Sequence, residues 1–302
     1  MHGHLQMNGE DILETAAVRI GSLAYQALLE EVYTSPKPGL VDLYSRGAHR
    51  DMDARTFECS AEALKPYFTS MVLEGMGFSG SPGLLFENIR RIGLSAEKAM
   101  YQATGGVNTH KGLIFHIGIL CGAAGACMRT GEGLTLKSLI EMEQAMVRET
   151  LIREVKNMRQ YTSHGEKNLE KYGTPGARGE AINGYSSVLE ISLPQMERRL
   201  KEGKDWNLIK LESLLLLMSQ VDDSNILARH NPGVLSEVRK LSGDFLKNEG
   251  VYRESSIRTL QSMDAEFIKR NISAGGCADL LAITIFLAEM GLGAGLGDEP
   301  VA

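Results

Sequence analysis

One short segment of the chain, residues 105–112 with the sequence GGVNTHKG, places two glycines, three hydrogen-bonding side chains and a lysine just before an apolar stretch. Glycines let backbone N–H groups converge on an anion, the start of the following helix adds partial positive charge, and Lys111 adds a full charge. The segment therefore predicts a phosphate site. A plain turn between helices is the competing interpretation. The substrate-binding residues predicted here are Gly105, Gly106, Asn108, Thr109, His110 and Lys111.

An earlier segment, PKPGLVD followed by GAHRDMD, places three carboxylates, a lysine and an imidazole within residues 37–53. Carboxylates grouped in this way bind hard cations, and magnesium needs only two or three of them beside water and phosphate oxygens. Asp53 is therefore a candidate metal ligand, although it could equally cap the next helix. Asp51 could be solvated, but capping explains neither His49 nor Lys37.

A second acidic cluster, residues 222–225 with the sequence DDSN, follows a very apolar stretch. Carboxylates at the C-terminus of a helix oppose the helix macrodipole, and a bound cation would relieve that cost. Asp222 and Asp223 are accordingly predicted to complete the metal site, and Asn225 beside them is a predicted substrate-binding residue. A solvated helix end is the alternative.

Two more glycine-rich segments precede apolar stretches. Residues 172–180, YGTPGARGE, bring Arg178 to the beginning of a helix, where guanidinium and backbone donors can hold phosphate together, unless Arg178 only pairs with Glu180. Residues 273–279, SAGGCAD, form either a second nucleotide cradle or a tight turn. Neither segment is a P-loop or a dinucleotide fingerprint. The candidate binding residues of the segment 273–279 are Ser273, Gly275, Gly276 and Asp279.

Helices must position all of these segments, because apolar residues recur at helical spacing along most of the chain and strand signals are weak. Asp53, Ser81 and Thr135 are plausible N-caps, and Pro82 suits a first helical position. We predict one all-α domain over residues 1–302, a bundle of roughly ten helices with the site formed by the loops between them. His116 is expected to be a core histidine. The five polar connections that could line one cleft are residues 34–53, 104–112, 161–179, 222–233 and 271–277.

The composition limits the possible partners. Of the 302 residues, 43% are hydrophobic and 23% charged, which is ordinary for a globular protein. The net charge of −6 argues against a broad surface for binding nucleic acid. Any polyanion must therefore be bound by a few cations grouped at one site. We find no secretory signal, and the most apolar stretch, residues 112–128, is interrupted by His116. A cytoplasmic protein without membrane or nucleic-acid partners is expected, and the sequence does not indicate its oligomeric state.

Taken in order, PKPGLVD with GAHRDMD, GGVNTHKG, GARGEAINGY, DDSN and SAGGCADLLA resemble the motifs of the triphosphoribosyl-dephospho-CoA synthase family across residues 30–287. The resemblance implies an all-helical enzyme that transfers the triphosphoribosyl unit of ATP to the 2′-hydroxyl of 3′-dephospho-CoA and releases adenine. Its product is the prosthetic-group precursor for the acyl carrier protein of citrate lyase or malonate decarboxylase, which a separate transferase system attaches.

The chain departs from that family pattern at a few positions. Ala274 and Cys277 stand where the pattern has proline and serine, Ser224 replaces a threonine, and His230-Asn231 replace glycines. A serine in place of threonine keeps the hydroxyl group. These departures concern fine specificity more than the class of reaction.

Displacement of adenine at the anomeric carbon passes through an oxocarbenium-like state, so the reaction needs a base for the incoming hydroxyl, help for the departing adenine and a metal on the phosphates. We assign the base to His49 or Asp51. The magnesium ligands are then Asp53, Asp222 and Asp223, and the phosphate contacts are Lys37, His110, Lys111 and Arg178.

Two other functions fit the same sequence. A magnesium-dependent hydrolase of ADP-ribose-like conjugates would use similar chemistry at the anomeric carbon, with water as the acceptor. A nucleotide-binding regulator would bind ATP without any reaction.

Overall fold

The helix start signals of the sequence coincide with helix N-termini in the computed structural model, which describes residues 9–130, 133–158, 164–174 and 176–291. Asp53 and Thr135 each form a capping box with the residue three positions later. Ser81 makes no capping hydrogen bond through its side chain, but Pro82 opens the helix that follows. These local interactions determine where three long helices begin.

Thirteen α-helices and no strand are present within the described ranges, so the all-α prediction is confirmed. The count exceeds ten because α6, α7 and α10 are short helices inside segments that the sequence analysis treated as loops. The helices are α1 (Gly9–Tyr33), α2 (Ala54–Gly77), α3 (Pro82–Ala103), α4 (Lys111–Thr130), α5 (Leu136–Asn157), α6 (His164–Tyr172), α7 (Gly176–Ile182), α8 (Leu193–Lys201), α9 (Trp206–Gln220), α10 (Ser224–Arg229), α11 (Pro232–Asn248), α12 (Ser256–Lys269) and α13 (Gly275–Glu289), with a π-helical turn at Val188–Ser192 before α8.

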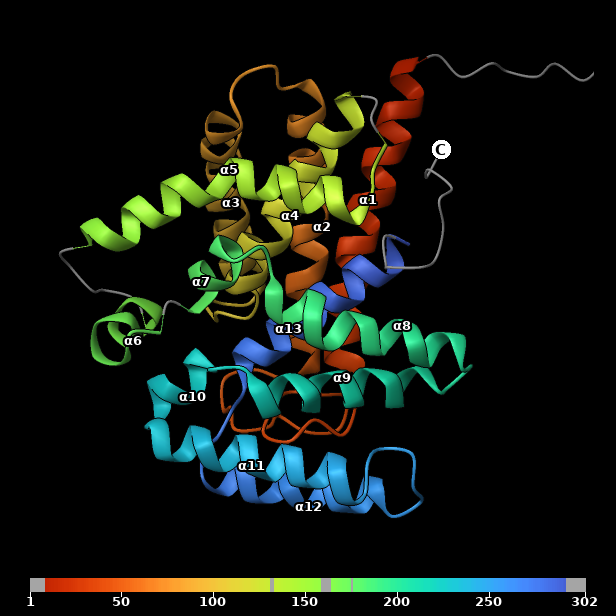
Figure 1. Cartoon of the computed structure of the whole chain (residues 1–302), viewed down its shortest axis with the longest axis vertical. Helices are drawn as coiled ribbons and strands as arrows, with labels where there is room; N and C mark the ends of the chain where they lie inside the picture. Colours follow the sequence, from red (N-terminus) through yellow and green to blue (C-terminus); the bar gives the residue numbers. More distant parts are fainter. Residues whose placement is uncertain (1–8, 131–132, 159–163, 175, 292–302) are drawn as a thin grey trace, which may run out of the picture.

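Helix α13 lies between two groups of helices. Helices α1 to α5 form the upper part of the molecule in Figure 1, and α8, α9, α11 and α12 form the lower part. Every residue from 280 to 287 is buried, and α13 contacts α1, α4, α8 and α9. The main hydrophobic core accordingly includes residues from α1 through to α13. An apolar helix in this position carries its N-terminal turn into the middle of the protein.

Helix α4 is longer and more apolar than the sequence analysis allowed for. Its segment Lys111–Arg129 has the length and composition needed to cross a membrane, but 78% of that apolar window is buried inside the structure. Helices that form the core of a protein pass the same test, so this property of α4 reflects its packing against α2, α3 and α5.

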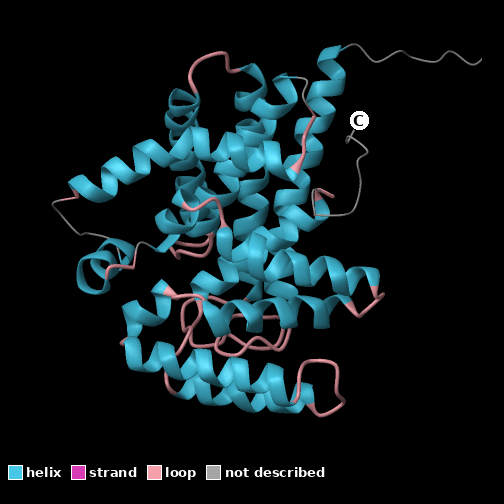
Figure 2. Cartoon of the chain, viewed as in Figure 1, coloured by secondary structure: helices cyan, strands magenta, loops and turns pink. Residues whose placement is uncertain are grey.

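The long connection between α1 and α2 is held in place by two aspartates. Asp42 accepts hydrogen bonds from Ser35 Oγ at 2.8 Å and from the backbone N–H of Lys37 at 3.0 Å. Asp264 of α12 accepts one from the N–H of Gly39 at 2.8 Å. Figure 2 shows this connection as a long loop in the lower half of the molecule. The connection is therefore held by hydrogen bonds within its own turn and by one hydrogen bond to the distant helix α12.

Close packing of α2 on α4 depends on glycine. A Cβ atom at Gly75 would lie 2.1 Å from the carbonyl oxygen of Gly122, and one at Gly125 would lie 2.0 Å from the carbonyl oxygen of Val72. Such distances are far below van der Waals contact, so the two helix backbones approach each other only because side chains are missing there.

We predict that Gly75→Ala separates α2 from α4 and lowers the free energy of unfolding by about 1–3 kcal/mol or more, as overpacked cores do. Gly77→Ala on the same helix is the matched control, because no atom lies within 4 Å of its added Cβ. Its stability should equal or slightly exceed that of the parent protein. Urea unfolding measures both variants, and equal losses in the two would contradict this account of the packing.

Candidate active site

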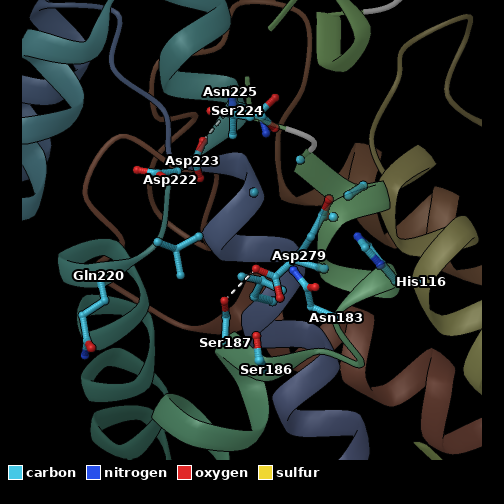
Figure 3. Close-up of a pocket in the computed structure, with 18 of the residues that line it drawn as sticks. His116, Asn183, Ser186, Ser187, Gln220, Asp222, Asp223, Ser224, Asn225 and Asp279 are labelled. Atoms are coloured by element: carbon cyan, nitrogen blue, oxygen red, sulfur yellow. Dashed lines mark hydrogen bonds between the residues drawn. The ribbon is translucent and has the colours of Figure 1, made fainter. Parts of the chain in front are cut away.

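Two neighbouring cavities lie where the polar loops meet. The larger has a volume of about 460 Å³ and the smaller about 170 Å³. Asn225 and Asp279 line both of them, so the cavities adjoin at these two side chains. Figure 3 shows Asp223 and Asn225 on one side of the larger cavity and Asp279 and Asn183 on the other.

Segments from all five predicted polar connections contribute to these walls. The larger cavity is lined by residues from 172–187, 220–225 and the first turns of α13. The smaller is lined by residues of the 34–53 loop, by 108–113, by α10 and by 273–279. Of the predicted site residues, the smaller cavity is lined by His49, Asn108, Thr109, His110, Lys111, Asn225, Ser273, Gly275 and Asp279. The larger is lined by Asp222, Asp223, Asn225, Gly276 and Asp279.

The smaller cavity is lined by two cations as well as by the carboxyl groups of Glu31 and Asp279. Lys111 and Arg229 both line it. The Lys111 ammonium lies 2.9 Å from Glu97, and half of its side chain stays exposed. Arg229 is anchored by its Nη1, which donates to the carbonyl of Ala48 at 2.9 Å and to Asn271 at 3.1 Å. Two cations held at the rim of a small hollow suit an anionic group.

His49 is positioned by contacts on both sides. Its Nε2 lies 3.1 Å from Ser273 Oγ, and the Arg229 guanidinium lies 3.3 Å from its ring nitrogens. Burial and the charge of Arg229 lower the pKa of His49, against the opposing effect of Asp51. The imidazole is therefore neutral near pH 7 and able to accept a proton.

His110 is oriented by Ser60, a residue that the sequence analysis did not single out. Thr109 Oγ1 donates to Ser60 Oγ at 2.7 Å, and Ser60 Oγ lies 2.7 Å from His110 Nδ1. This chain of hydrogen bonds fixes the orientation of the His110 ring. The buried Nε2 of this ring has no partner within the described part of the chain. It leaves one hydrogen-bonding ring nitrogen for a ligand in the smaller cavity.

The larger cavity has the opposite character. None of its lining residues in the described ranges is a lysine or an arginine. Its carboxyl groups come from Glu180, Asp222, Asp223 and Asp279, and burial raises the pKa of Glu180 and of Asp223. Such a cavity suits an uncharged group with several hydrogen-bonding atoms.

The predicted three-aspartate metal site is not formed. No group of three or more Asp, Glu, His or Cys residues suited to a metal ion occurs among the described residues. Asp53 caps α2 and pairs with Arg46 at 3.1 Å. Asp222 pairs with Arg239 at 2.9 Å. Asp223 accepts three backbone hydrogen bonds inside the protein, and these satisfy its carboxylate without a cation.

Five other predicted residues lie outside both cavity walls. Lys37 is completely buried and forms an ion pair with Glu31, which leaves no exposed surface for a phosphate contact. Asp51 is exposed beyond the rim. Arg178 is half-buried on α7, and its positive charge helps to lower the pKa of Glu154. Gly105 and Gly106 are exposed and have positive φ angles, so their role in the structure is to form the turn before α4.

Several lining residues were not singled out from the sequence. Glu180 and Asn183 belong to the quoted motif GARGEAINGY, and Arg229 follows the acidic cluster in the sequence, but none of the three was predicted to be a site residue. His116 is buried, as expected for a core histidine, yet it also faces the larger cavity. Pro175 of the 172–180 segment lies outside the described residues.

Comparison with known proteins gives the same family as the motifs. A family model described as ATP:dephospho-CoA triphosphoribosyl transferase matches residues 17–297. The chain belongs to this family. Members of the ATP:dephospho-CoA triphosphoribosyl transferase family are enzymes, and the chain is accordingly a transferase. No solved structure matches it.

Individual transferase relatives align along nearly the whole chain. A probable 2-(5''-triphosphoribosyl)-3'-dephosphocoenzyme-A synthase of Photobacterium profundum is 37% identical over 273 residues, covering 90% of this chain and 87% of the relative. One of Vibrio cholerae is 38% identical over 274 residues, covering 90% and 88%. The 2-(5''-triphosphoribosyl)-3'-dephosphocoenzyme-A synthase of Klebsiella pneumoniae is 36% identical over 281 residues, covering 92% and 93%.

The buried histidine of the larger cavity predicts a pH effect on the stability of this transferase. Burial lowers the pKa of His116 to about 3. In the unfolded chain a histidine takes up a proton below about pH 6.5, whereas folded His116 stays neutral down to its lower pKa, so it favours unfolding increasingly as the pH falls through that window. Replacing it by His116→Gln removes this effect.

We expect the free energy of unfolding of the parent protein, relative to that of His116→Gln, to fall by about 2 kcal/mol between pH 7 and pH 5. The comparison cancels the carboxyl groups that both proteins share. Urea unfolding at several pH values measures it. Parallel stability curves for the two proteins would show that His116 is not held neutral by burial.

Proposed function

We propose that this enzyme transfers the 5-triphosphoribosyl group of ATP to the 2′-hydroxyl of 3′-dephospho-CoA and releases adenine. The observation that carries the proposal is the pair of adjoining cavities, one with cations and one without. ATP has the same division, because its ribose carries the triphosphate at C5′ and the uncharged adenine at C1′. The ribose would then lie at the junction formed by Asn225 and Asp279.

The triphosphate belongs in the smaller cavity under this proposal. Lys111 and Arg229 supply charge there, and Nε2 of His110 supplies a buried ring nitrogen that has no partner among the described residues. A helix N-terminus also meets the cavity, because α4 begins at Lys111. Local cations of this kind are consistent with a chain whose net charge is −6.

His49 is the favoured base for the incoming hydroxyl. It lines the smaller cavity, is neutral near pH 7, and is held between Ser273 and Arg229. Asp51, the alternative from the sequence, is exposed outside the cavity wall. A base must reach the proton that it removes, so position favours the histidine.

The acidic residues do not fit a resident magnesium ion. Asp53, Asp222 and Asp223 are each occupied by other partners, and the described residues form no cluster of three ligands. Magnesium would instead arrive bound to the phosphates of ATP, as part of the substrate. No step of the proposed reaction depends on a metal held by the protein.

The decisive experiment incubates the purified enzyme with magnesium and ATP, with and without 3′-dephospho-CoA, and follows adenine by chromatography and the product by mass spectrometry. We expect adenine to appear mainly with the acceptor, in equal amount with a triphosphoribosyl-dephospho-CoA product. Adenine released without acceptor would identify a hydrolase. Binding of ATP with no release under either condition would identify a regulator.

We predict that His49→Asn lowers the rate of transfer by roughly a hundred- to ten-thousand-fold, the usual contribution of a general base, while ATP binding persists. Asp51→Asn is the comparison from the same loop and should keep most of the activity. Steady-state kinetics and calorimetric titration with ATP measure the two effects. Loss of turnover in Asp51→Asn alone would reassign the base to Asp51.

The surrounding biology is part of the same proposal. We infer that the product serves as the prosthetic-group precursor of an acyl carrier protein, of the citrate lyase or malonate decarboxylase type, and that the enzyme works in the cytoplasm. The sequence resemblance supports this placement, and it requires neither a nucleic-acid nor a membrane partner.

A further inference from the structure

Asp279 occupies the junction between the two cavities. This residue lines both of them, from the first turns of the central helix α13. No hydrogen bond to this carboxyl group is formed by the residues that the structure describes. A carboxyl group with that position and no partner of its own is available to a ligand that spans the two cavities.

The carboxyl group of Asp279 is fixed by contact with the backbone of α4. A Cβ atom at Gly112 would lie 2.0 Å from Asp279 Oδ2, so the carboxyl rests directly on the space that this glycine leaves free. A larger residue at position 112 would displace the carboxyl group. Gly112 follows Lys111 in the chain, and the group therefore has a defined position relative to the cationic wall.

The environment of Asp279 favours its protonated form. Burial raises the pKa of Asp279 well above its usual range, and the negative charges of Glu31 and Asp223 raise it further. Within the described chain the other ionisable residues that line the two cavities are His49, His110, Lys111 and Arg229 on one side and His116, Tyr172, Glu180 and Asp222 on the other. A neutral carboxylic acid can donate a proton.

We propose that Asp279 is the general acid that protonates the departing adenine, an inference that rests on the proposed transferase function. The C1′–N9 bond of ATP breaks, and its electron pair goes to the adenine ring. The Asp279 proton moves to an adenine ring nitrogen. The 2′-oxygen of dephospho-CoA forms the new bond to C1′, and its proton goes to His49. Water then returns the proton from His49 to Asp279, so the enzyme is restored.

This assignment follows from where the scissile bond must lie. With triphosphate in the cationic cavity and adenine in the cavity without cations, the C1′–N9 bond crosses the junction that Asp279 lines. The adenine anion is a poor leaving group, so adenine departs readily only when a ring nitrogen is protonated. A positioned general acid commonly accelerates such a step by a factor of about a hundred to ten thousand. His49 lines only the smaller cavity and Asp279 lines both, so the base and the acid are separate groups, as in enzymes that act on glycosidic bonds.

The test compares two substrates in Asp279→Asn. One is ATP, and the other is 4-nitrophenyl riboside 5-triphosphate, whose nitrophenolate departs without protonation. With ATP we expect the transfer rate to fall by roughly a hundred- to ten-thousand-fold, and with the nitrophenyl substrate by less than about tenfold. Asp244→Asn, an exposed aspartate of α11 outside both cavities, is the matched control and should react normally with both substrates.

Gly112→Ala gives an independent measurement, because it displaces the carboxyl group without removing it. It should also lose more activity with ATP than with the nitrophenyl substrate. Equal losses on both substrates in Asp279→Asn would overturn the inference and leave Asp279 a structural role. If the parent enzyme itself releases no adenine with dephospho-CoA, the proposed function fails instead, and the two failures are thereby distinguished.

Discussion

The site depends on one buried carboxylate. Asp223 Oδ1 accepts hydrogen bonds from the backbone N–H groups of Asn225 at 2.8 Å and Ile226 at 3.0 Å, and Oδ2 accepts one from that of Cys277 at 2.8 Å. The first two begin α10, and the third begins α13. A single side chain thus joins two turns that are 54 residues apart and places Asn225 next to Asp279. Losing it would leave buried N–H groups unsatisfied and separate the two cavity walls.

Much of the fold follows from local patterns, because capping and helical periodicity act over a few residues. Asp53 and Thr135 start their helices as the sequence predicts, and the glycine-rich segments lie between helices. The convergence of the loops also follows from local structure, since an apolar helix such as α13 must be buried and carries its N-terminal turn inwards. The short helices α6 and α10 were missed because they lie in polar segments that lack an apolar periodicity.

The roles of individual acids were harder to predict, because capping a helix and binding a metal require the same residue types. What separates the two uses is the partner. The partner of Asp53 is Thr56, only three residues later in the sequence. The partners Arg239 of Asp222 and Cys277 of Asp223 are distant in the sequence and are brought close only by the fold. Lys37 has a partner only six residues away, yet its burial comes from packing and not from its neighbours in the chain.

The departures from the family motif can be understood from the same contacts. Cys277 holds Asp223 through its backbone N–H, so the exchange of serine for cysteine leaves that hydrogen bond in place. Its thiol is buried, and burial together with the charge of Asp223 raises the thiol pKa well above its usual range, which keeps it uncharged next to the carboxylate. Ala274 is also buried. Asn231 caps α11 by accepting from the N–H groups of Gly233 and Val234. Cys277 and Asn231 therefore support helix ends, whereas Ser224 lines the larger cavity and keeps the hydroxyl group of the threonine that it replaces.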